Sequence, residues 1–72
     1  MIKPGRYRHY KGQEYEVVGT AKHSETEEEF VVYRQLYGTG DLWIRPKEMF
    51  AEQVLINGQA LPRFQFLQEP PV

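Results

Sequence analysis

The chain has 72 residues and a net charge of −1, which is the size of one small domain. It contains no cysteine, so disulfides and thiolate metal sites are excluded. A domain this short buries only about 60% of the surface of its unfolded chain, so its core depends on large side chains. Five Tyr, four Phe and one Trp supply them. Self-association is the other source of stability that the composition leaves open.

Charge is distributed unevenly along the chain. Residues 1–12 carry four Lys or Arg and no acid, residues 13–29 carry six Glu against one Lys, and residues 30–72 balance at four against four. The first two segments neutralise each other if they pair as neighbouring strands. If they do not pair, a separate basic face would indicate an anionic partner.

The first half of the chain reads as three short strands. We expect strands over residues 7–10, 14–23 and 29–37, with a turn at residues 11–13 and a polar, acidic loop at 24–28. Both faces of the third strand are substantially apolar, which predicts a central position in a sheet.

The second expected strand alternates, and we place four side chains on one face: Tyr15, Val17, Gly19 and Ala21. Gly19 inside the strand predicts a bulge or a sharp bend.

The second half begins with a turn at residues 38–41 and a short strand at 42–45. Pro46 fits the first position of a helical turn, and Met49 and Phe50 would then cover the core. A fifth strand at 52–56 and a sixth at 59–67 flank Asn57-Gly58, a strong hairpin signal. Pro62 restricts the first half of the sixth strand to a sheet edge.

These elements predict an all-β fold, a small and strongly bent antiparallel SH3-like barrel of five or six strands with one short helical turn near residues 46–50. Residues 1–67 form this single domain, and we expect residues 68–72 to be a disordered C-terminal tail. The alternative is an open meander that completes its core by dimerising, since a small open sheet leaves two edges unpaired.

Several short motifs occur in a fixed order along the chain: RHYKG, HSET, LYG, LWIRPKEMF and a closing PRF. In this order, over residues 5–67, they resemble the small bacterial family known as domain of unknown function 1653. The resemblance implies a stand-alone cytoplasmic bacterial domain with no assigned activity. It supplies no functional residues to transfer to this chain.

Trp43 and Arg45 are the first candidates for a binding surface. If Leu42 and Ile44 point inward, Trp43 and Arg45 point outward together, and such a pair is typical of interface anchors. If Trp43 instead points into the core, the leucine is exposed. Further candidates come from other strands, and the full candidate set is Arg8, Tyr10, Tyr33, Tyr37, Trp43 and Arg45.

Two other functions compete with this interpretation. The basic and aromatic first strand, with Arg6, Arg8, Tyr10 and Lys11, could bind single-stranded nucleic acid, although the balanced net charge argues against it. His9, His23 and Glu25 could serve a small enzyme or a metal-dependent domain, but their spacing matches no common ligand motif.

We therefore expect a non-catalytic binding module without a metal or cofactor. Its partner would be a protein or peptide, or a second copy of the chain, bound through an aromatic and arginine surface. The first residues lack the apolar run of a signal peptide, and no stretch approaches the length of a membrane span. We expect a cytoplasmic location with no membrane partner.

Overall fold

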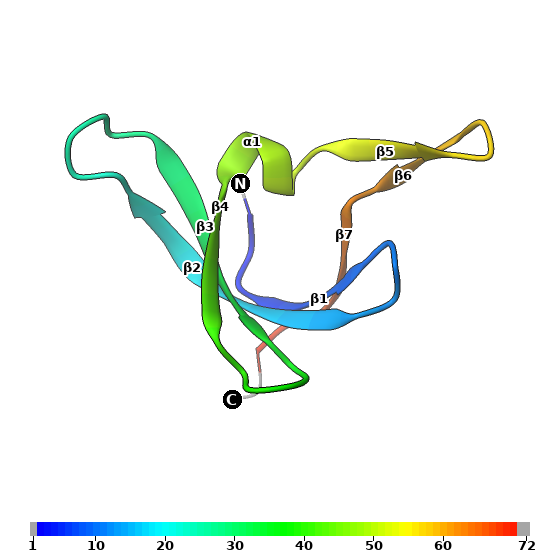
Figure 1. Ribbon diagram of the computed structural model, residues 1–72, viewed down its shortest axis with the longest axis horizontal. Coiled ribbons are helices and arrows are strands. Elements are labelled where there is room, and N and C mark those ends of the chain that lie inside the picture. The colour runs from blue at the N-terminus through cyan, green and yellow to red at the C-terminus, as the bar shows by residue number, and fades with distance from the viewer. Residues whose placement is uncertain (1, 71–72) are drawn as a thin grey trace.

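The computed structural model describes residues 2–70, and it is an all-β domain with one short helix (Figure 1). Its elements in chain order are β1 (Gly5–His9), β2 (Glu14–Lys22), β3 (Glu29–Gln35), β4 (Leu42–Pro46), α1 (Lys47–Phe50), β5 (Gln53–Ile56), β6 (Gln59–Pro62) and β7 (Phe64–Gln68).

The turns follow the local signals of the sequence. Asn57 and Gly58 join β5 to β6 with φ angles of 50° and 77°, both positive as a tight hairpin turn requires. Pro46 ends β4 and precedes α1 as its N-cap residue, one position before the place expected for it. The expected helical turn and the expected hairpin are both confirmed.

Five strands form one antiparallel sheet in the order β4-β3-β2-β1-β7, and β5 pairs with β6 in a separate hairpin. Because β4 and β7 are the two ends of this order, no closed barrel is found among residues 2–70, and the SH3-like barrel is not confirmed. The expected sixth strand is in fact two strands. The Arg63 amide donates to the Glu52 carbonyl and the Arg63 carbonyl accepts from Tyr10, so the chain changes partner strand there.

A bulge interrupts the pairing of β2 with β3. Val17 lies opposite Tyr33 and Gly19 opposite Val32, which leaves Val18 as the extra residue. The irregularity predicted at Gly19 is therefore present, but the uniform face predicted for this strand is wrong. Beyond Val18 the side chains exchange faces, so Ala21 lies on the face opposite to Val17.

The core occupies the inner face of the curved sheet. This inner face carries the buried side chains Tyr7, Val17, Val31 and Tyr33, with Phe50 from α1 and Phe64 from β7 completing the cluster. The Phe50 and Phe64 rings are stacked, with centroids 4.1 Å apart and planes 3° apart. Met49, also expected over the core, is 44% exposed.

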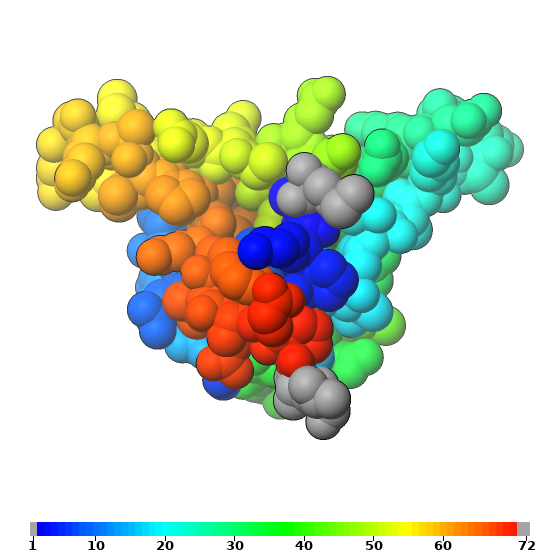
Figure 2. Space-filling view, turned by 180° about the vertical axis from the view of Figure 1, so that it is seen from behind, coloured from blue at the N-terminus to red at the C-terminus, as the bar shows by residue number. Residues whose placement is uncertain are grey.

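Two hairpins extend beyond this core on opposite sides of the molecule, the distal end of β2–β3 and the β5–β6 hairpin (Figure 2). Strand β7 continues through Gln68, the first residue of the segment expected to be a tail, and residues 71–72 lie outside the described chain. No helix of the described residues is long and apolar enough to span a membrane.

Candidate binding surface

The pairing of β3 with β4 decides which way the candidate residues of β4 point. Trp43 lies opposite Tyr33 and Arg45 opposite Val31, so both project from the inner face. Trp43 is nevertheless 50% exposed, because β4 is an edge strand and nothing covers its outer side. The structure thus combines the two alternatives: Trp43 shares the face of the core and is also accessible.

Two tyrosines extend this surface along the inner face. The hydroxyls of Tyr15 and Tyr37 lie 2.8 Å apart, and their rings meet edge to face with centroids 5.5 Å apart. Tyr15 also meets the ring of Tyr33, at 5.4 Å. Burial of the phenol, with the Tyr37 hydrogen bond second, raises the pKa of Tyr15 from 10.0 to about 12. The set Tyr15, Tyr33, Tyr37, Trp43 and Arg45 is called the aromatic face below.

Arg45 supplies the positive charge of the aromatic face. Its Nε–H donates to the Tyr33 hydroxyl at 3.3 Å, and its guanidinium carbon lies 5.6 Å from the centre of the Phe64 ring. No carboxylate of residues 2–70 lies within salt-bridge distance of this guanidinium. Its terminal N–H groups are therefore available to a ligand.

Tyr10 joins the aromatic face indirectly. Its ring lies 4.5 Å from that of His9, which in turn meets Phe64 at 5.0 Å. Phe64 contacts Tyr15 at 5.6 Å, so a continuous series of rings runs from Tyr10 to the aromatic face.

Arg8 is separated from the other candidates because it projects from the outer face of the sheet. Glu14 binds both cations of this strand: its Oε1 lies 2.8 Å from Arg6 Nε, and its Oε2 lies 3.1 Å from an Arg8 terminal nitrogen. The neutralisation of the basic segment by the neighbouring strand, one of the two expectations from the sequence, is thus observed.

Four of the six candidates, Tyr33, Tyr37, Trp43 and Arg45, come together, while Tyr10 is linked through His9 and Arg8 lies apart. The sequence reasoning missed Tyr15 as a surface residue. Its alternation with Val17 marked it as inward-facing, and only its neighbours Tyr33 and Tyr37 show that this position reaches the rim of the core.

The two histidines lie in different parts of the fold and each holds a turn. The Nδ1 atom of His9 accepts from the Lys11 amide at 3.2 Å, whereas His23 Nδ1 accepts from the amides of Glu25 and Thr26 at 3.1 and 3.3 Å. Among residues 2–70 no three His, Asp or Glu side chains are grouped so that they could hold a metal ion. The structure therefore does not bring His9, His23 and Glu25 together.

Positive charge near His9 reinforces its role as an acceptor. Burial lowers the pKa of His9 below its ordinary value, and the neighbouring charges of Arg45, Arg63 and Lys11 lower it further. The ring is consequently held neutral, with Nδ1 free to accept.

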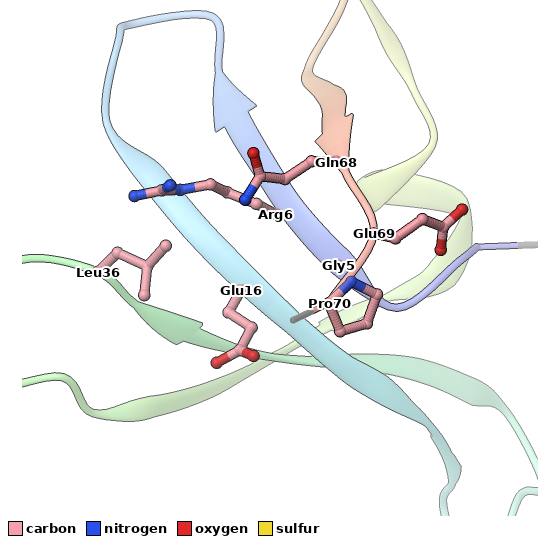
Figure 3. A pocket seen from close by; sticks show the side chains of 7 residues that line it. All are labelled: Gly5, Arg6, Glu16, Leu36, Gln68, Glu69 and Pro70. Atoms are coloured by element: carbon pink, nitrogen blue, oxygen red, sulfur yellow. The ribbon is translucent and has the colours of Figure 1, made fainter. Parts of the chain in front are cut away.

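A hollow of about 230 Å³ lies away from the aromatic face, where β1 and β2 approach the end of β7 (Figure 3). Its lining residues are Gly5, Arg6, Glu16, Leu36, Gln68, Glu69 and Pro70. Its Arg6 is already paired with Glu14, and its Glu69 lies 3.9 Å from Lys3. The charged groups here thus serve contacts within the chain, and the aromatic face is the stronger candidate.

The fold and this surface define a small open-sheet domain with an accessible cluster of rings and one unpaired arginine. Residues 5–66 match the family model described as a protein of unknown function, DUF1653, and the chain belongs to that family. It is similar to the crystal structure of a DUF1653 protein from Bordetella bronchiseptica, with a TM-score of 0.86 and 34% identity over 99% of this chain and 94% of that one. Among curated proteins nothing matches. The family resemblance expected from the motifs is confirmed.

Proposed function

We propose that this domain is a non-catalytic binding module that takes an extended protein segment on its aromatic face. The observation that carries the proposal is the juxtaposition of Trp43, 50% exposed, with an arginine on the same face of the same strand. Large half-exposed rings beside a guanidinium are the residue types that dominate protein recognition.

The polar groups of the face indicate the chemistry of the segment. Arg45 uses Nε–H for Tyr33, which leaves the terminal donors for a carboxylate in a two-pronged contact. Tyr15 and Tyr37 share one hydrogen bond, so one of the two hydroxyls keeps a proton to donate to a peptide carbonyl. A segment with an acidic residue beside a proline or aliphatic side chain fits these groups.

Nucleic-acid binding is less well supported. Arg6 and Arg8, which would contact phosphates, are both engaged by Glu14 on the outer face. The rings that would stack on bases lie on the inner face, away from those cations.

The proposal is tested by selecting linear peptides from a displayed random library against the immobilised domain. Enriched peptides should carry Asp or Glu beside Pro or an aliphatic residue, and Trp43→Ala and Arg45→Gln should each weaken binding by about tenfold or more. Arg8→Gln, on the opposite face, is the matched control and should bind as the wild type does. Far-UV circular dichroism verifies that each variant is folded.

Failure of the selection to enrich any peptide would contradict the proposal. So would an equal loss in Arg8→Gln, or low-salt binding of single-stranded oligonucleotides that disappears in Arg8→Gln, because those results place recognition on the basic strand.

A further inference from the structure

Strand β4 ends the five-stranded sheet with one side of its backbone unpaired. The Gln35 amide donates to the Asp41 carbonyl at 3.2 Å, and hydrogen-bonded pairs alternate in an antiparallel ladder. Trp43 and Arg45 therefore direct their backbone groups toward β3. Leu42 and Ile44 direct their N–H and C=O groups away from the sheet, where residues 2–70 provide no neighbouring strand.

The side chains of this edge are unusually apolar for an exposed strand. Leu42, Trp43 and Ile44 are 58%, 50% and 62% exposed, so both faces of β4 present apolar surface. Natural edge strands are commonly protected by lysine, by inward-pointing charge or by a covering element. In β4 the one charged side chain, Arg45, lies on the inner face against Tyr33 and Phe64.

We propose that β4 pairs antiparallel with β4 of a second copy of this chain, about a two-fold axis that passes through Ile44. This inference goes beyond the proposed function and does not rest on it. The two copies would form one continuous sheet of ten strands, since each contributes a five-stranded sheet.

The backbone groups at the edge match in this register. Ile44 exchanges N–H and C=O bonds with Ile44 of the second copy, and the Leu42 amide donates to the Pro46 carbonyl of the second copy. Pro46 has no N–H to satisfy, and it lies at the end of the paired segment, where a proline does not interrupt the ladder.

The side chains are self-complementary as well, and this argues for a second copy rather than an unrelated strand. On the inner face Trp43 lies opposite the second copy's Arg45, a ring and a cation, so that no two cations face each other. On the outer face Ile44 meets its own symmetry mate and Leu42 meets Pro46. An interface about a two-fold axis requires this kind of self-matching.

Oligomeric state gives the first test, by light scattering coupled to gel filtration. The wild-type mass should be twice the 8.5 kDa of one chain, and Ile44→Lys should halve it. Because Ile44 is 62% exposed, the lysine is tolerated by the monomer fold. Leu55→Lys, at a side chain 73% exposed on β5, is the matched control and should keep the double mass. A wild-type monomer would overturn the proposal, and so would a dimer that survives Ile44→Lys.

The register has its own test, which the absence of native cysteine makes clean. Residues directly opposite in a hydrogen-bonded pair have Cα atoms about 5.5 Å apart, within the range of a disulfide. Ile44→Cys should therefore form a covalent dimer on mild oxidation, whereas Leu42→Cys should not. Cross-linking of Leu42→Cys or Trp43→Cys without Ile44→Cys would refute this pairing. Peptide selection by the monomeric Ile44→Lys variant separates the two proposals, because that variant retains the aromatic face.

Discussion

Phe50 is the side chain that joins α1 to the sheet, and its removal should cost most of the stability of the domain. It is 2% exposed, stacks on Phe64 at 4.1 Å and meets the edges of Tyr7 and Tyr33 at 5.5 and 5.6 Å. Truncating a buried phenylalanine to alanine costs about 3–5 kcal/mol. At roughly 0.05–0.15 kcal/mol per residue, a domain of this length has about 4–11 kcal/mol in total. Phe50→Ala should therefore lower the urea midpoint strongly, as followed by far-UV circular dichroism.

Met49→Ala is the matched control, since Met49 lies in the same helical turn but is 44% exposed. Its free energy of unfolding should change by no more than about 1 kcal/mol. If the two variants lost equal stability, or if Phe50→Ala lost less than about 1 kcal/mol, the aromatic cluster would not be what anchors α1.

Two further predictions concern a glycine and a tyrosine. Gly5 has φ 140°, and a Cβ there would collide with the Gln68 carbonyl oxygen. Gly5→Ala should thus lower the thermal midpoint more than Gly12→Ala, whose positive φ carries no such collision, and equal losses would contradict the account. Because the folded state raises the pKa of Tyr15 from 10.0 to about 12, the unfolded chain loses this proton first and stability falls as pH rises through that interval. Tyr15→Phe should flatten this decline in urea midpoints, and an unchanged decline would refute it.

Local signals in the sequence predicted the individual elements well. Asn57-Gly58 specified its hairpin, Pro46 preceded the helix, and the apolar third strand lies inside the sheet. The open sheet was not predicted, because it depends on the partners of Arg63. Its amide and carbonyl bond to residues eleven and fifty-three positions away, Glu52 and Tyr10, and no local pattern encodes such distant contacts.

The orientation of the candidate site required the structure for a related reason. Leu42, Trp43, Ile44 and Arg45 form a strand that is apolar on both faces, so alternation alone could not assign an inner face. The partner Tyr33 decides it, since opposite residues project to the same side. That Trp43 stays accessible follows from strand order, which is a property of the whole sheet.

The extra residue Val18 makes chain length itself informative within β2. Deleting it would let the ladder run uninterrupted and would turn the distal hairpin over, bringing Ala21 to the interior and sending Thr20 outward. A substitution at the same place changes one exposed group, whereas a deletion reassigns every later side chain of the strand. The count of residues between the turn at Gly12 and the acidic loop thus works like a reading frame for the sheet.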